Sequence, residues 1–168
     1  LLDQNIMENL RHVAQYLGKL KIKLDSVSYT VLVTNCKILQ RRNLPKLKAL
    51  LLDWTSSEIT EEFPTFRPKC PNVESLRIMF RGTKNIPIED FTLRLIRGIH
   101  KLKNLSFNFN GCTFMADEHL GVIGKALQSG LHQLESLEMR FKGLEDGVTA
   151  KGISNLWKSM SKIPNLKE

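Results

Sequence analysis

The chain has 168 residues, enough for one domain with a hydrophobic core, and 42% of them are hydrophobic while 25% are charged. This ordinary globular composition argues against disorder over most of the length, and no apolar run approaches the roughly 18 residues that a membrane span requires. The net charge of +8 suits an anionic partner such as nucleic acid or an acidic protein, but it serves solubility equally well.

One sequence motif recurs along the chain: a leucine or valine, any two residues, a leucine, and then apolar residues at alternate positions. Its copies cover residues 17–24, 47–54, 73–80, 102–109 and 134–141. The second positions of these copies, which lie 30, 26, 29 and 32 residues apart, are Leu20, Leu50, Leu76, Leu105 and Leu137. Alternation at period two predicts short strands with one buried face, so we expect strands near residues 19–25, 49–55, 75–81, 104–110 and 136–142. The final residues begin a sixth copy, in which Leu166 follows Leu137 by 29 residues.

Most segments between these strands have apolar residues at helical spacing. We expect helices over residues 6–17, 28–43, 90–102, 118–134 and 149–163. Residues 28–43 are ambiguous, because Val31, Leu32 and Val33 have strand propensity, but between two repeat strands a helix is the better interpretation. Acidic residues that suit a helix N-terminus occur at Glu89–Asp90, Asp117–Glu118 and Glu145–Asp146. Residues 55–71 differ, because Pro64, Pro68 and Pro71 predict a loop or a single turn there. The expected unit is therefore strand, loop, helix and loop.

The copies of this motif resemble leucine-rich repeats of the long, helix-bearing kind found in ribonuclease inhibitor, and the resemblance covers roughly residues 6–168. The resemblance implies an α/β solenoid, a right-handed β-α superhelix with a parallel sheet on its concave side and helices on its convex side. Such repeats mostly serve as platforms that bind other proteins. The polar ladder usual after the strand is clear only at Asn110 and Cys112. We expect residues 1–168 to form a single leucine-rich-repeat domain, and, because neither end looks like a polar cap, a fragment of a longer solenoid.

Side-chain parity divides each expected strand into two faces. The aromatic column of Trp54, Phe80, Phe109 and Phe141 shares the side of the leucines, so we expect a core stack rather than a platform for nucleic-acid bases. The opposite parity gives the concave face. Its positive charges are Lys21, Lys23, Arg77, Arg81, Arg140 and Lys142, its negative charges are Asp25, Asp53 and Glu138, and the sum is +3.

Apolar residues beside arginines on this face are typical of a protein-binding patch. The candidate partner-binding residues are Leu51, Arg77, Met79, Arg81, Asn108, Arg140 and Lys142. Three functions stay open: a non-catalytic protein-interaction module or scaffold that uses the concave face, a nucleic-acid or anion binder that uses the basic surface, and a structural brace within a large assembly. A solvated sheet face without a partner is the alternative to the first of these.

The sequence carries no recognisable catalytic or metal-binding pattern. His12, His100, His119 and His132 form no metal-binding spacing, and no phosphate-binding glycine loop or nucleophile motif occurs. The three cysteines, Cys36, Cys70 and Cys112, lie far apart, which favours buried thiols in a reducing compartment but leaves one disulfide open. We therefore expect an intracellular, cytoplasmic protein without enzyme activity, cofactor, small-molecule substrate or membrane span.

Overall fold

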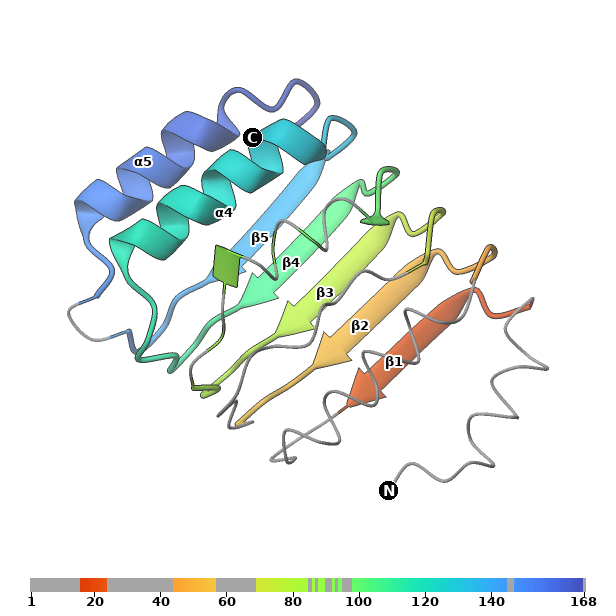
Figure 1. The fold of residues 1–168 in the computed structure, drawn as a ribbon, viewed down its shortest axis with the longest axis horizontal. Helices are drawn as coiled ribbons and strands as arrows, with labels where there is room; N and C mark the ends of the chain where they lie inside the picture. The colour runs from red at the N-terminus through yellow and green to blue at the C-terminus, as the bar shows by residue number, and fades with distance from the viewer. Residues whose placement is uncertain are drawn as a thin grey trace.

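The computed structural model describes residues 16–23, 44–56, 69–84, 86, 88–89, 92, 94, 98–144 and 147–167. They form an α/β fold in which five parallel strands make one sheet and follow their order in the sequence (Figure 1). The strands are β1 (Lys19–Lys23), β2 (Ala49–Asp53), β3 (Ser75–Met79), β4 (Asn104–Asn108) and β5 (Ser136–Arg140). Two helices, α4 (Asp117–Gly130) and α5 (Ala150–Met160), pack against each other on one face of the sheet.

The copies of the recurring motif lie in register across the sheet. Pairing joins, from β1 to β5, the residues Leu20, Leu50, Leu76, Leu105 and Leu137. Each strand begins at the residue that the motif predicts and ends two residues before the predicted end. Hydrogen bonds between neighbouring units nevertheless continue past the strands, as from Trp54 N to Met79 O at 2.8 Å and from Ser56 N to Arg81 O at 2.7 Å.

A left-handed residue ends this continued pairing at the same position of four consecutive units. The residues and their φ angles are Ser56 at 55°, Gly82 at 66°, Gly111 at 71° and Gly143 at 70°. Glycine adopts this conformation without the steric cost that a Cβ brings, which accounts for three of the four residues. At Gly82 and Gly111 the chain leaves the sheet, and the next residues, Thr83 and Cys112, are buried.

The aromatic column lies in the core, as its parity predicts. Trp54, Phe80 and Phe109 are each at most 1% exposed, and Phe141 is half-buried at the end of the stack. The ring centroids of Phe80 and Phe109 lie 5.4 Å apart, and those of Phe109 and Phe141 lie 5.8 Å apart in a stacked arrangement. These contacts stabilise the core beyond the area that the rings bury. The buried rings offer no surface on which bases could stack.

Two buried side chains tie the loops after the strands to the preceding unit. Thr83 Oγ1 donates to the Trp54 carbonyl at 2.6 Å, and the Cys112 thiol donates to the Phe80 carbonyl at 3.0 Å. Thr83 and Cys112 occupy equivalent positions, three residues after Phe80 and Phe109. The ladder that the sequence indicates at Cys112 therefore includes a threonine as well.

The described cysteines, Cys70 and Cys112, are buried free thiols. Burial raises the pKa of Cys70 to about 12 and that of Cys112 to about 11. Both thiols therefore stay protonated near neutral pH, where a protonated thiol is a poor nucleophile. Neither joins a disulfide, and Cys36 lies outside the described residues.

Both described helices end before their predicted limits. The sequence predicts helices over 118–134 and 149–163, whereas α4 ends at Gly130 and α5 at Met160. The apolar residues beyond these ends are buried, but they belong to the turns that lead into the next strand. Leu134 N donates to Leu131 O at 3.2 Å, and Ile163 N donates to Met160 O at 2.9 Å.

The predicted register of the sixth copy is wrong by three residues. Lys167 N donates to Glu135 O at 2.9 Å, just as Glu135 N donates to Lys103 O at 2.8 Å. Leu166 therefore corresponds to Leu134 and not to Leu137. The spacing at the end of the chain is 32 residues, the same as between the two preceding copies.

The first residue of α4 organises the start of α5. Asp117 accepts hydrogen bonds from Thr149 N at 2.8 Å and from Thr149 Oγ1 at 2.6 Å. Thr149 Oγ1 accepts in turn from Lys151 N at 3.2 Å, which caps α5 at its predicted boundary. A Cβ at Gly152 would clash with the Asp117 carboxylate, so glycine at this position allows Asp117 to approach the first turn of α5 closely.

Several expected elements fall on residues that the structure does not describe. They are the helix over 28–43, most of the helix over 6–17 and most of the loop over 55–71. The last two residues of the range 6–17, Tyr16 and Leu17, are described and are not helical. Within the predicted helix over 90–102, the described Thr92, Arg94 and Gly98 are helical, whereas residues 99–102 are not. Helical backbone is already present before the predicted start, at Ile88 and Glu89. No helix within the described ranges is both long and apolar enough to span a membrane.

We predict that Gly111→Ala lowers the free energy of unfolding by about 1 kcal/mol, because a left-handed backbone disfavours a Cβ. Space does not limit the change, since the added carbon would lie 3.8 Å from Gly82 Cα. Gly121→Ala is the matched control, because this α4 glycine has nothing within 4 Å of its Cβ position and alanine raises helix stability by up to about 1 kcal/mol. Chemical denaturation followed by circular dichroism measures both variants, and equal effects would contradict the conformational argument.

Candidate functional site on the outer sheet face

The candidate residues lie on the sheet face that points away from the helices, here called the outer face. Burial alternates along the strands, as the parity predicts: in β3, Leu76 and Ile78 are buried, whereas Arg77 is exposed and Met79 is half-buried. Pairing places Leu51 of β2, which is half-buried, beside Arg77. Every residue predicted for partner binding is accessible to solvent at least in part.

Four of the predicted residues surround one hollow in the outer face. It has a volume of about 60 Å³ and is lined by Arg77, Met79, Ser106, Asn108, Glu138 and Arg140. The exposed Arg81 and Lys142 lie two residues beyond the ends of β3 and β5, in the next row of the same face. Ser106 and Glu138 also line the hollow, although the sequence analysis did not propose them for partner binding. Their row in the sheet is the signal that would have found them, because Ser106 pairs with Arg77 and Glu138 pairs with Ser106.

Glu138 is the negative centre of this hollow, and its partners already neutralise it. Arg140 Nε donates to Glu138 Oε1 at 2.8 Å, and Arg140 Nη2 lies 2.6 Å from the same oxygen. Ser106 Oγ donates to Glu138 Oε2 at 2.9 Å. The Arg140 and Ser106 hydrogen bonds lower the pKa of Glu138, and the charges of Arg140 and Arg77 lower it further. Glu138 therefore stays ionised and orients Arg140 over the hollow.

Two polar residues at the strand ends are less exposed than the parity predicts. Asp53, expected as a solvated negative charge, is only 7% exposed. Its Oδ1 accepts from Thr55 Oγ1 at 2.6 Å and from Thr55 N at 3.3 Å. Asn108 Oδ1 accepts from Asn110 N at 3.0 Å in the equivalent turn. Asp53 therefore does not belong to the charges of the outer face, and Asn108 contributes there with only part of its hydrogen-bonding capacity.

Arg77, Arg81 and Lys142 on the outer face are less neutralised than the lysines at the strand starts. At the strand starts, Lys48 pairs with Glu74, and Glu135 pairs with Lys167 at 2.8 Å and with Lys103 at 3.9 Å. No comparable ion pair involves the exposed Arg77, Arg81 or Lys142 within the described part of the chain. The charge of the outer face is therefore available to an anionic partner.

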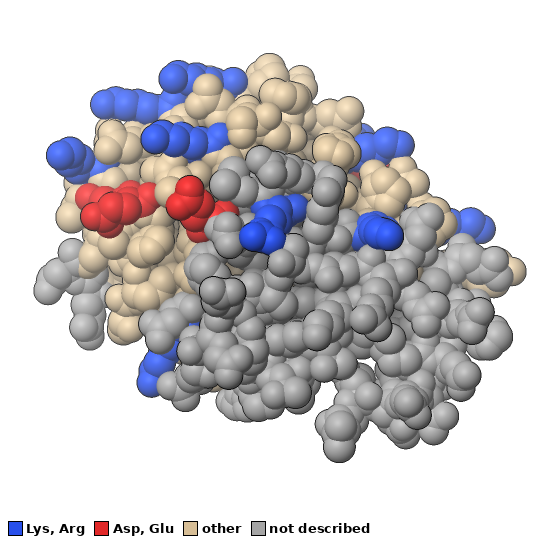
Figure 2. Space-filling view, in the orientation of Figure 1, with Lys and Arg blue, Asp and Glu red and all other residues tan. Residues whose placement is uncertain are grey.

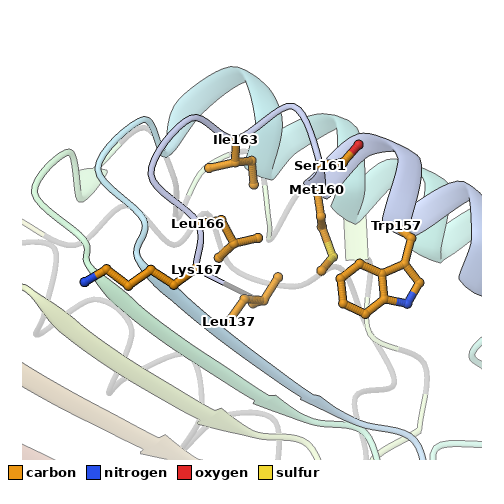
Figure 3. Close-up of a pocket in the computed structure, with 7 residues that line it drawn as sticks. All are labelled: Leu137, Trp157, Met160, Ser161, Ile163, Leu166 and Lys167. Atoms are coloured by element: carbon orange, nitrogen blue, oxygen red, sulfur yellow. The ribbon is translucent and has the colours of Figure 1, made fainter.

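A second hollow lies at the end of the sheet beside β5. It has a volume of about 550 Å³ and is lined by Leu137, Trp157, Met160, Ser161, Ile163, Leu166 and Lys167. Figure 3 shows apolar side chains from β5, α5 and the last turn around one space, with Lys167 extending away from it. Leu137 is half-buried here, whereas its counterpart Leu105 is 3% exposed, and Trp157 is 61% exposed.

The helix side carries further basic residues. Figure 2 shows lysine and arginine side chains gathered over α5, where Lys151, Lys158 and Lys162 are exposed, with acidic side chains nearby. At the other end of the helix side, Lys101 Nζ donates to Asn72 Oδ1 at 2.8 Å. The described basic residues are thus spread over the helices, the strand starts and the outer face, and do not form one continuous stripe.

The described residues hold no group of histidine, cysteine and acidic side chains that could bind a metal. His119 caps α4, because its Nδ1 accepts from Ala116 N at 3.0 Å, a structural use of the side chain. Comparison with models of known protein families finds no match, and neither does comparison with curated proteins.

We predict that Arg140→Ala raises the pKa of Glu138 toward its ordinary value, because it removes the largest cause of the lowered pKa. Ser106→Ala raises it less, and Lys125→Ala on α4 leaves it unchanged. Since the folded pKa is lowered, the pair stabilises the fold above the unfolded pKa, and this contribution is lost as pH falls through the folded pKa. An NMR titration of the Glu138 carboxyl carbon measures these shifts, and an unshifted pKa in Arg140→Ala would refute the assignment.

Proposed function

We propose that the chain is part of a leucine-rich-repeat solenoid of the ribonuclease-inhibitor-like class. The sequential order and common register of β1–β5 support this proposal, as do the left-handed residues at one position of four consecutive units. Residues 163–167 support it further, because they start another unit with the same hydrogen bonds as the unit before. A stack of such units presents one continuous sheet face.

We propose further that the chain is a non-catalytic interaction module that binds another protein through the outer face. The observation that carries this proposal is the hollow around Met79, where exposed arginines adjoin half-buried apolar residues and a polar rim. Arginine and methionine are enriched in protein interfaces, and arginine is a frequent hot-spot residue. A face that only contacts water gains nothing from placing Leu51 between Lys21 and Arg77, or Met79 between Arg77 and Arg81.

The end hollow beside β5 favours a second candidate function, a structural brace. Its lining is mostly apolar, and Trp157 and the 39% exposed Ile153 add apolar surface on α5. Exposed apolar patches of this kind mark surfaces that other protein segments cover. In this role the chain would pack end-on against the next unit, whether that unit continues the same solenoid or belongs to another molecule of an assembly.

Nucleic-acid binding receives less support from the same surfaces. Single-stranded binders stack bases on exposed aromatic rings in a continuous basic groove. Here Trp54, Phe80 and Phe109 are buried, and the negatively charged Glu138 lines the hollow of the outer face. The basic residues at the strand starts are paired with glutamates.

We predict that the double substitution Arg77→Glu/Arg81→Glu reduces partner capture at least about tenfold, because each arginine contributes charged hydrogen bonds to the interface. Immobilised chains capture proteins from native extract, and quantitative mass spectrometry compares the retained proteins. Lys125→Glu/Lys162→Glu is the matched control, since it makes the same charge change at exposed positions on the helix side. If every protein retained by the wild type is also retained by the outer-face variant, the outer face is not the binding surface.

The brace is tested through Trp157. Trp54→Phe leaves Trp157 as the single tryptophan, because the sequence contains two. Packing of the end hollow in a native assembly should shift Trp157 fluorescence to shorter wavelength and protect it from iodide quenching. Unchanged quenching in the assembled state would rule out the brace at this surface without affecting the outer-face proposal.

A further inference from the structure

We propose that the outer face recognises an acidic, extended polypeptide segment with carboxylate, apolar and carboxylate side chains at alternate positions. The carboxylates would pair with Arg77 and Arg81, and the apolar side chain would cover Met79. This inference rests on the proposed function and adds to it the chemistry of the partner.

The spacing along β3 selects this pattern. Arg77, Met79 and Arg81 have the same parity, and Arg77 and Arg81 are exposed on either side of the half-buried Met79. Neighbouring side chains on one strand face lie roughly 6.6 Å apart, so the two arginines are roughly 13 Å apart. An extended peptide laid along β3 has the same rise and brings its side chains i, i+2 and i+4 over these three residues.

The size of the hollow favours single side chains over a small molecule. Small-molecule sites usually enclose about 300–1,000 Å³, whereas this hollow has only about 60 Å³. A partner therefore meets a shallow surface and inserts one group at most. Recognition must then depend on several contacts along the face, as in peptide binding.

The charges of the face favour carboxylates as the partner's groups. Glu138 does not repel them strongly, because Arg140 and Ser106 already engage both of its oxygens. Arg77 and Arg81 have no ion pair among the described residues, and a guanidinium binds a carboxylate through two parallel hydrogen bonds. Lys142, in the same row as Arg81, adds positive charge at the edge.

The test measures binding of three fluorescent probes by anisotropy at physiological salt. The first is a capped synthetic peptide with glutamate, leucine and glutamate at alternate positions, separated by serines. The second has glutamine in place of both glutamates, and the third is a single-stranded oligonucleotide. We expect the wild type to bind the glutamate peptide at least about tenfold more tightly than the glutamine peptide.

Substitutions then locate the contact. Arg77→Gln and Arg81→Gln should each weaken binding of the glutamate peptide about tenfold or more, whereas Lys125→Gln, an exposed residue of α4, should not change it. Arg77→Lys should lie between wild type and Arg77→Gln, because lysine keeps the charge and loses the paired hydrogen bonds. Melting curves confirm that each variant is folded.

Three results would overturn the proposal. Equal affinity for the glutamate and glutamine peptides would show that the outer face does not recognise carboxylates. Tighter binding of the oligonucleotide than of the glutamate peptide would indicate that the outer face binds nucleic acid instead. Absence of binding to the glutamate peptide at millimolar concentration would show that the outer face does not bind an acidic segment of this pattern. If the peptide fails while capture from extract still depends on Arg77 and Arg81, only the acidic class is wrong; if both fail, protein binding by the outer face is wrong as well.

Discussion

The structure depends on the in-register parallel pairing of its strands, because this pairing stacks each side chain on its counterparts in the neighbouring strands. In the core the stacking is favourable, since leucines pack on leucines and Phe80 lies between the rings of Trp54 and Phe109. At the surface the same geometry would bring like charges within about 4.8 Å of each other. The strand starts avoid this by alternating sign from Lys48 to Glu74, Lys103 and Glu135.

The outer face avoids repulsion differently, by placing neutral residues between its charges. Leu51 separates Lys21 from Arg77, and Asn110 separates Arg81 from Lys142. Charges that alternate in sign neutralise one another within the chain, whereas charges that are only spaced apart keep their field. Neutral spacing therefore leaves positive charge for a partner, and this contrast with the strand starts supports a binding role for the outer face.

The sequence predicted the strands and their register because period-two alternation depends only on which face is buried. It overextended the helices because Leu131 and Ile163 continue the apolar spacing although their backbone has already turned. The same residues explain the misplaced sixth copy: Leu131, Leu134 and Leu137 are three apart, so two apolar residues alone fit either register. Asp53 was misjudged because an aspartate that caps a turn and one that contacts water have the same place in the pattern.

The two candidate surfaces differ in a way that separates their roles. The hollow beside β5 is apolar and relatively large, and surfaces of this composition resemble a domain core cut open and suit permanent packing. The outer face is charged and shallow, which suits an association steered by electrostatics and reversible in salt. Both can operate in one molecule, because the helices and the sheet edge are engaged in the first and the strand faces in the second. A brace that positions the sheet would thus leave the outer face free to bind.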